Sequence, residues 1–158
     1  MKLIKQKATL ITQKAGLEGL YKQIELCGRT CYKSEDKITE DSATRFVEAM
    51  IKNKHHAMLE HGTVYLMYPK SNEAGWKFYS TNPYSKCHFS GDFMAITTNL
   101  RVLVEHNRMD DLQYQSAPMP KHELRITMKF TTDRGVANEL VRHRVFSFAQ
   151  ESTRQWRH

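Results

Sequence analysis

Near its carboxyl end the chain reads Asp133-Arg-Gly-Val-Ala-Asn-Glu-Leu-Val-Arg-His-Arg-Val-Phe-Ser-Phe-Ala-Gln-Glu-Ser-Thr-Arg154, a stretch that predicts a helix followed by a polar segment. Apolar residues recur at helical spacing from Val136 to Val141, and Asp133 stands where a helix N-cap is expected. The triplet Arg142-His143-Arg144, the RHR triplet, then falls at the carboxyl end of that helix, where the helix dipole favours cations.

The residue types around the RHR triplet favour a site for phosphate groups. Guanidiniums hold phosphates through paired hydrogen bonds, and an imidazole and a hydroxyl add further donors. Seven residues separate the triplet from Ser152. If that segment is extended, Gln150, Ser152 and Arg154 face the same way. Basic clusters also occur on solvated faces, so a charged surface without a ligand stays open as the other interpretation.

The same residues resemble the signature of the flavin-dependent thymidylate synthases, in which an RHR triplet is followed after seven residues by serine. A second block, His55 to His61, resembles the family's His-x4-Glu-His element, which precedes a strand. Weaker matches are Arg29-Thr30-Cys31-Tyr32 and Thr98-Asn99-Leu100-Arg101. The four blocks follow the family's order and span roughly residues 24 to 154, and only the RHR-to-serine block is specific by itself.

The resemblance implies an enzyme that methylates dUMP to dTMP. Methylenetetrahydrofolate would be the carbon donor, FAD the hydride carrier and NADPH the reductant of the flavin. No cysteine attacks the uracil in this family, so the protein mainly binds, orients and polarises while the cofactor does the redox work. The resemblance also implies a homotetramer whose flavin lies between subunits.

Individual roles follow from the resemblance, position by position. Implied flavin contacts are His55, Cys31, Arg142, His143 and Arg144, and implied dUMP contacts are Glu139, Gln150, Glu151, Ser152 and Arg154. Ser152 and Arg154 are the residues expected to serve catalysis, and Arg154 either clamps the phosphate or polarises the uracil. Glu139 occupies a position that is glutamine in many members, so a charge there would change the nucleotide contact.

Family chains usually continue past the Ser-x-Arg element into further helices. Residues 1–158 are therefore expected to form a single domain that lacks those helices. This leaves a non-catalytic nucleotide- or flavin-binding homologue open as an alternative function.

Composition bounds the remaining possibilities. The chain has 158 residues, 40% of them hydrophobic, which suits one soluble globular domain. No apolar run could span a membrane, the first residues lack a secretory signal, and three cysteines suit reduced thiols, so a cytoplasmic location is expected. The net charge of +7 suits phosphate-rich small ligands or nucleic acid. Because no nucleic-acid module is visible, nucleic-acid binding is the weaker hypothesis.

The histidine block invites a comparison with metal sites. A helical zinc-protease motif needs two histidines four residues apart, whereas His61 follows His56 by five residues and His55 by six. We therefore rank flavin contact by His55 first, buried structural roles for Glu60 and His61 second, and a metal third; no metal ligand is assigned.

Hydrophobic periodicity predicts an α+β fold. The family resemblance implies an antiparallel sheet with packed helices, like that of the flavin-dependent thymidylate synthases. Expected strands cover 2–11, 63–68, short pieces at 76–79, 88–89 and 93–94, and a half-buried strand carrying Leu124, Ile126, Met128 and Phe130. Expected helices run from about Leu17 to a cap at Gly28, over 39–53 and over 96–106, with a loop at 115–120.

Overall fold

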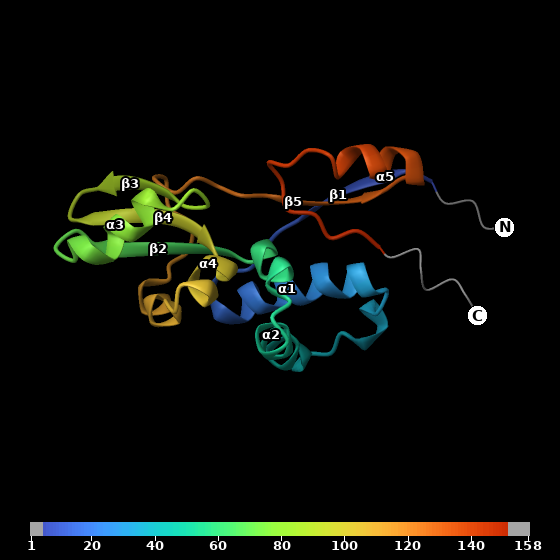
Figure 1. Cartoon of the computed structure of the whole chain (residues 1–158), viewed down its shortest axis with the longest axis horizontal. Helices are drawn as coiled ribbons and strands as arrows, with labels where there is room; N and C mark the ends of the chain where they lie inside the picture. The colour runs from blue at the N-terminus through green and yellow to red at the C-terminus, as the bar shows by residue number, and fades with distance from the viewer. Residues whose placement is uncertain (1–4, 152–158) are drawn as a thin grey trace.

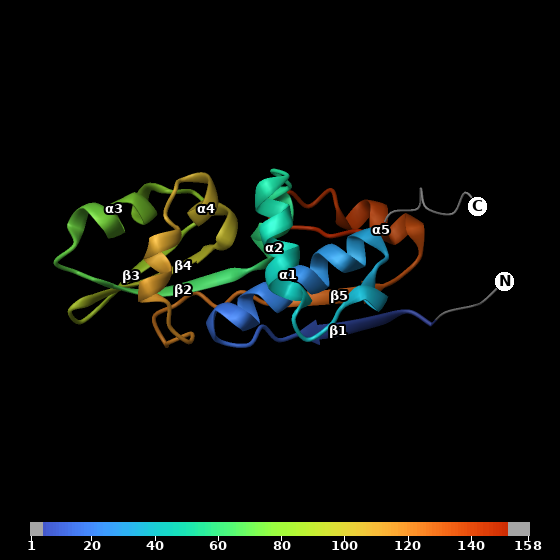
Figure 2. The same ribbon diagram turned by 90° about the horizontal axis from the view of Figure 1, so that it is seen from below.

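The computed structural model describes residues 5–151 and has an α+β fold with two small antiparallel sheets. Figures 1 and 2 show an elongated molecule, with one sheet, α3 and α4 at one end and the other sheet with α5 at the opposite end. The elements are β1 (Lys7–Ile11), α1 (Gly16–Tyr32), η1 (Glu35–Lys37), α2 (Ser42–Lys52), η2 (His56–His61), β2 (Thr63–Pro69), α3 (Glu73–Thr81), β3 (Lys86–Ser90), β4 (Phe93–Asn99), α4 (Leu100–Glu105), η3 (Met109–Tyr114), β5 (Thr127–Thr131) and α5 (Arg134–Leu140).

The larger sheet has the strand order β2-β4-β3, with antiparallel pairing throughout. Ile96 at its centre stands opposite Leu66 on one side and Cys87 on the other. A turn at Gly91, with φ of 60°, joins β3 to β4. Apart from Phe93, every residue of β4 is buried. This strand is therefore the rigid support from which α4 starts.

One hydrophobic core joins that sheet to the first two helices. Its buried members are Leu20, Ile24, Val47, Met50, Leu59, Val64, Leu66, Tyr68, Tyr79, Met94, Ile96, Leu100, Val102 and Leu103. They come from α1, α2, η2, β2, α3, β4 and α4. Neither β1, β5 nor α5 contributes a buried residue to this core. None of the helices within residues 5–151 is long and apolar enough to cross a membrane.

Gly62 brings the histidine block against the first helix. A Cβ at this position would lie 2.5 Å from Cδ1 of Ile24 and 2.7 Å from Cδ1 of Leu20, so only glycine lets the backbone pass this close to α1. Its carbonyl accepts a hydrogen bond from the Leu100 N–H at 3.0 Å. The end of η2 is thereby held between α1 and α4.

The sequence-based prediction that Gly28 ends the first helix is wrong. The helix continues to Tyr32 and is capped by Lys33, whose φ is 51°. A Cβ on Gly28 would lie 2.5 Å from Cζ of Phe46, which is the residue that packs there from α2. Glycine at this position allows α1 and α2 to pack closely. The sequence pattern alone does not distinguish such a glycine from one that caps a helix.

The predicted strand piece at residues 76–79 is also wrong, because these residues lie within α3. The Asn72 side chain accepts a hydrogen bond from the Gly75 N–H and caps this helix. Gly75 and Tyr79 are buried while Lys77 between them is exposed, whereas in a strand all three would share one face. Aromatic β-propensity misled the prediction, and the cap and the core decided the outcome.

The predicted helix at 96–106 is correct only in its second half. Residues up to Asn99 belong to β4, and α4 covers Leu100–Glu105. The Asn99 side chain accepts from the Val102 N–H at 3.1 Å and so caps the helix directly after the strand. The prediction of a helix at 39–53 is confirmed as α2, with residues 39–41 forming the turn before it.

The smaller sheet pairs β1 with β5 antiparallel, with Thr9 opposite Lys129. It attaches to α1 through a hydrogen bond of 2.9 Å from Nε2 of Gln23 to Oγ1 of Thr127. The predicted strand is present as β5, although Leu124 and Ile126 precede it. Its predicted half-burial is wrong, because the alternating apolar residues are exposed: Leu124 by 70%, Ile126 by 73%, Met128 by 38% and Phe130 by 54%. The alternation marks a face suited to burial, and no part of residues 5–151 covers it.

Candidate functional site

The RHR triplet follows α5 directly, as the sequence predicts. The Asp133 side chain caps the helix by accepting from the Val136 N–H at 3.0 Å, and the helix ends at Leu140. The Arg142 N–H still donates to the Glu139 carbonyl at 3.2 Å, within a tight turn. The triplet therefore stands at the carboxyl end of a short helix, where its positive charge is favoured.

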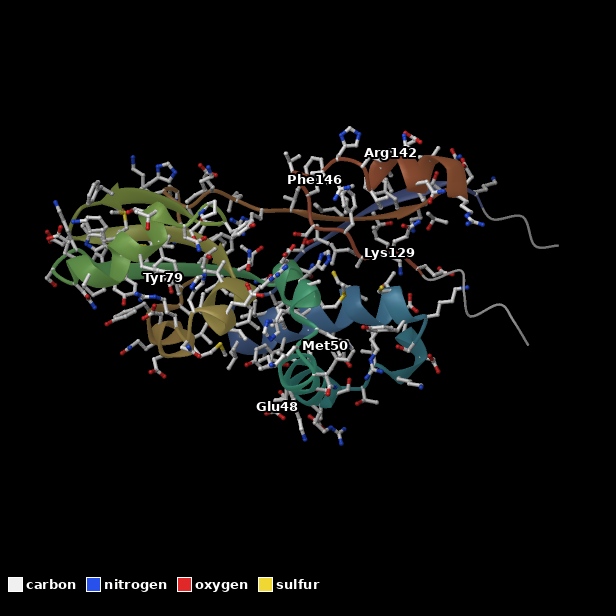
Figure 3. The ribbon with its side chains drawn as sticks, viewed as in Figure 1. Glu48, Met50, Tyr79, Lys129, Arg142 and Phe146 are labelled. Carbon is white, nitrogen blue, oxygen red and sulfur yellow. The ribbon has the colours of Figure 1, made fainter. Side chains whose placement is uncertain are left out.

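All three side chains of the triplet are exposed in the single chain. Figure 3 shows Arg142 on the α5 side of the β1–β5 pair, pointing outward. Its guanidinium makes an ion pair of 3.1 Å with Glu139, but both side chains are largely solvated. Solvation makes such a pair weak, so the donors of the triplet are available to an anionic ligand at little cost.

Residues 147–151, shortly after the triplet, are tied to the body of the protein by contacts with two earlier blocks and with Lys33. The Ser147 hydroxyl donates to Oε2 of Glu60 at 2.7 Å. Gln150 makes a backbone hydrogen bond to the Cys31 thiol, and Glu151 forms an ion pair with Lys33. Residues that resemble separate family blocks, at 29–32, 55–61 and 142–152, thus converge along one short segment.

Glu60 is itself held by an ion-pair network on α4. Nη1 of Arg101 lies 2.5 Å from Oε1 of Glu60, and Nε of Arg101 lies 2.8 Å from Oε1 of Glu105. His56 approaches the same Glu105 oxygen at 3.2 Å. Burial alone would raise the pKa of Glu105, but hydrogen bonds from Arg101 and His56 outweigh it and lower that pKa. The fourth block, which contains Arg101, is therefore joined to the other three.

A cavity of about 100 Å³ lies beside this network. Its walls are formed by Glu60, Tyr84, Asn99, Arg101, Val102, Glu105 and His106. The two glutamates already compensate the single guanidinium in it, so the cavity is polar without an uncompensated charge that would select an anion.

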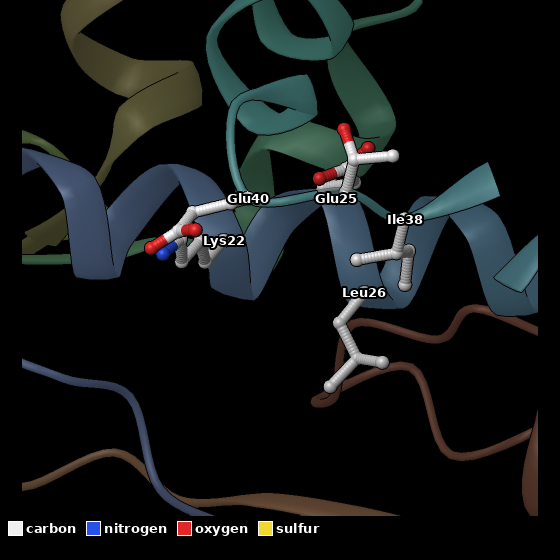
Figure 4. Close-up of a pocket in the computed structure, with 6 residues that line it drawn as sticks. Lys22, Glu25, Leu26, Ile38 and Glu40 are labelled. Carbon is white, nitrogen blue, oxygen red and sulfur yellow. The ribbon is translucent and has the colours of Figure 1, made fainter.

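A second depression, of about 380 Å³, lies between α1 and the residues before α2. Figure 4 shows Lys22 and Glu40 pointing toward one another at its edge, with Leu26 and Ile38 nearby. Glu25 at this place is buried, accepts from the Ser42 hydroxyl at 2.9 Å and pairs with Arg29 at 3.1 Å. None of the sequence-predicted site residues lines this depression, so it stays outside the candidate site.

His61 occupies a largely desolvated position next to Glu60. Burial lowers the pKa of its imidazole, while a hydrogen bond with the Phe148 backbone and the Glu60 charge act in the opposite direction. Its Nε2 is buried without a hydrogen-bond partner among the described residues. Within residues 5–151 no three histidine, cysteine or acidic side chains gather in a way that could hold a metal ion. The neutral ring is thus the form that the fold accommodates.

Acidification is expected to destabilise the fold through His61. Because the folded-state pKa lies below the usual 6.5, the contribution is present above that pH and is lost as pH falls below it toward the folded-state pKa. One such proton changes the free energy of unfolding by at most about 1.4 kcal/mol per pH unit. Urea unfolding at about pH 7.5 and about pH 5.5 should show a smaller loss in His61→Gln than in wild type.

The matched control for this effect is His143→Gln, because His143 is exposed. This variant should retain the wild-type pH dependence. An equal loss of stability in wild type and His61→Gln would show that another group carries the effect.

The structure either shows the remaining predicted residues without a hydrogen bond to the RHR triplet or does not describe them. His55 precedes η2, and its N–H donates to the Met50 carbonyl at 2.9 Å while the side chain is exposed. Among the described residues no hydrogen bond joins His55 to the RHR triplet, so its flavin contact stays a prediction. Ser152 and Arg154 lie outside the described residues.

Sequence reasoning missed the connecting role of Ser147. It treated Arg101 as part of a weak motif match and Glu60 as a buried structural residue, and it gave Ser147 no role. The signal for all three was their place in the four blocks, but side-chain pairing across the chain cannot be deduced from spacing. Comparison of the chain with protein-family models, with curated proteins and with solved structures found no match.

Proposed function

We propose that this chain is a flavin-dependent thymidylate synthase with the fold of that family. It would convert dUMP to dTMP with methylenetetrahydrofolate as carbon donor, FAD as hydride carrier and NADPH as reductant. A cytoplasmic location accompanies this proposal, and the free thiols of Cys27, Cys31 and Cys87 are consistent with it.

One observation carries the proposal. The four blocks on which the resemblance rests lie far apart in sequence, yet contacts of Glu60 with Arg101 and Ser147, and of Cys31 with Gln150, bring them together. A chance likeness of short motifs would give no reason for all four blocks to meet. Their convergence is what a shared functional site requires.

The described residues after α5 could form one wall of a binding site for a flavin nucleotide. Arg142, His143 and Arg144 offer exposed, charged donors of the kind that bind phosphate groups. The next two residues, Val145 and Phe146, expose 86% and 65% of their surface and offer apolar contact area to a flat ring. Cationic and apolar groups side by side match a ligand that carries both phosphates and an aromatic ring.

In this proposal the residues of the chain bind, orient and polarise. Bound FAD supplies the hydride for the reductive methylation. Gln150 and Glu151, fixed by Cys31 and Lys33, hold the segment that leads into Ser152 and Arg154, the residues assigned to dUMP. A cationic donor aimed at charge developing on uracil contributes about 3 kcal/mol of transition-state stabilisation, and Arg154 is the residue to which we assign that role.

The exposed apolar surface supports assembly into a homotetramer with the flavin between subunits. Between residues 123 and 151 no side chain is buried in the single chain. The exposed apolar residues of this region include Leu124, Ile126, Phe130, Val136, Val145 and Phe146. Exposed apolar side chains gathered in one region are typical of an interface, and a second copy of the chain would cover them while completing the site.

Purified protein is expected to bind FAD, to bind dUMP and to oxidise NADPH in the presence of dUMP and methylenetetrahydrofolate. Arg142→Ala combined with Arg144→Ala should weaken FAD binding by about ten- to a hundredfold, because each lost bond involves a charged donor. Flavin fluorescence titration measures the affinity, and sedimentation of the flavin-loaded sample should find a tetramer.

Arg45→Ala is the charge-matched control, since Arg45 is exposed on α2 away from the candidate site. It should leave FAD affinity unchanged. Binding of FAD and dUMP without NADPH oxidation would instead favour the non-catalytic homologue. Indifference to both ligands, with affinity for nucleic acid that falls steeply with salt, would reject the proposal in favour of nucleic-acid binding.

A further inference from the structure

The loop after α5 has no regular secondary structure to hold it. Between Val141 and Glu151 the backbone forms turns and irregular chain only. Its path therefore depends on side-chain anchors, and the one nearest to the RHR triplet is the bond from Ser147 to Glu60. Ser147 follows Arg144 by three residues, so this contact directly limits where the triplet can lie.

The acceptor of that bond sits on a rigid support. Arg101, in the first turn of α4, reaches Glu60 and Glu105 with two different nitrogens of one guanidinium. The helix starts from the buried strand β4 and is capped by the Asn99 side chain. The Glu60 carboxylate is thus oriented by a chain of contacts that ends in the core.

We propose that Glu60 is a positioning residue that holds the RHR loop, through Ser147, in the conformation that binds the flavin. This inference rests on the proposed function. Glu60 touches neither cofactor nor substrate in this role; it acts through the serine hydroxyl.

The physical reason is pre-organisation. A loop that must be ordered at the moment of binding loses affinity, whereas a loop already held in place does not. Arg101 adds a second effect, because its ion pair partly compensates the Glu60 charge and so reduces the repulsion between that carboxylate and an anionic ligand at the nearby triplet.

The test compares variants that break the contact from either side. Ser147→Ala should weaken FAD binding about tenfold, as expected for a lost hydrogen bond to a charged group. Ser147→Thr, which keeps the hydroxyl, should restore the wild-type affinity. Glu60→Ala should weaken binding at least as much, and adding Ser147→Ala to it should produce no further loss, because both act through one contact. Ser80→Ala is the control, since the Ser80 hydroxyl is exposed and donates to the Lys77 carbonyl within its own helix.

Fluorescence titration with FAD and urea unfolding are measured on every variant. A loss of affinity at an unchanged urea midpoint in Ser147→Ala, with rescue by threonine, supports the inference. If wild type and Ser147→Ala bind FAD equally well, the inference is overturned and the proposed function stands. If the FAD affinity and the urea midpoint of Ser147→Ala both fall, and threonine does not restore them, Glu60 has a purely structural role and the inference is overturned. Wild-type protein that does not bind FAD overturns both.

Discussion

Replacing Asp111 by alanine is expected to lower the free energy of unfolding by about 3–5 kcal/mol, which is typical of breaking a buried charged network. Oδ1 of Asp111 accepts from the Tyr68 hydroxyl at 3.0 Å, and Oδ2 accepts from the Tyr79 hydroxyl at 2.6 Å. Arg108 pairs with the same carboxylate at 3.2 Å. Removing the carboxylate leaves two tyrosine hydroxyls and a guanidinium without their acceptor.

Both tyrosines are protonated donors throughout the neutral range. Burial, followed by the hydrogen bond to Asp111, raises the pKa of Tyr68 to about 12 and raises that of Tyr79 further. Arg108 also lies over the Phe78 ring, 4.1 Å from its centroid, so it cannot turn to solvent without losing that contact. The polar cluster therefore has no low-cost rearrangement once Asp111 is gone.

Urea unfolding followed by circular dichroism measures this loss. Asp110→Ala is the matched control, because Asp110 is the preceding residue and is exposed. It should change the free energy of unfolding by no more than about 0.5 kcal/mol. Equal midpoints for the two variants would mean that the buried tyrosine hydroxyls find other acceptors.

Leu20→Ala is expected to cost about 2–5 kcal/mol of stability, the range for truncating a fully buried leucine. Leu20 is 0% exposed and belongs to the core that joins α1 to the larger sheet. Its Cδ1 would be 2.7 Å from a Cβ at Gly62, which shows how closely the backbone after η2 packs on it. The variant leaves a cavity that the surrounding sheet and helices cannot close without moving.

Leu17→Ala provides the comparison on the same helix, since Leu17 is 44% exposed. Because nearly half of the Leu17 surface is already in solvent, truncating it exposes less buried area, so its cost should be smaller than that of Leu20→Ala. Because Gly62 follows the histidine block, Leu20→Ala should also reduce FAD affinity under the proposed function. A Leu20→Ala protein as stable as Leu17→Ala would show that the Leu20 side chain contributes little to the core.

The candidate site illustrates what residue spacing can and cannot provide. The position of the RHR triplet after a capped helix was predictable, because N-caps and helix-terminal charges act within a few residues. The bond from Ser147 to Glu60 spans 87 residues and was not predictable, because it depends on how α5, η2 and α4 come together.

The errors in the fold prediction have the same origin. Trp76 to Tyr79 have the composition of a strand, yet they form a helix because Asn72 caps it and Tyr79 fits the core. Gly28 has the residue type of a helix cap, yet Phe46 requires it for space. In both cases packing between residues distant in sequence outweighed the local conformational preference, which contributes less free energy.

The sequence by itself determined the α+β class, most strand and helix positions, and a cationic cluster at a helix end, because periodicity, capping and charge are local properties of the chain. Only the tertiary structure decided that Glu60, Arg101, Cys31 and Ser147 meet near one segment, and that the apolar faces of β5 and the RHR loop stay exposed among the described residues. Those outcomes depend on close packing between elements distant in sequence, and no local pattern encodes which distant surfaces will meet.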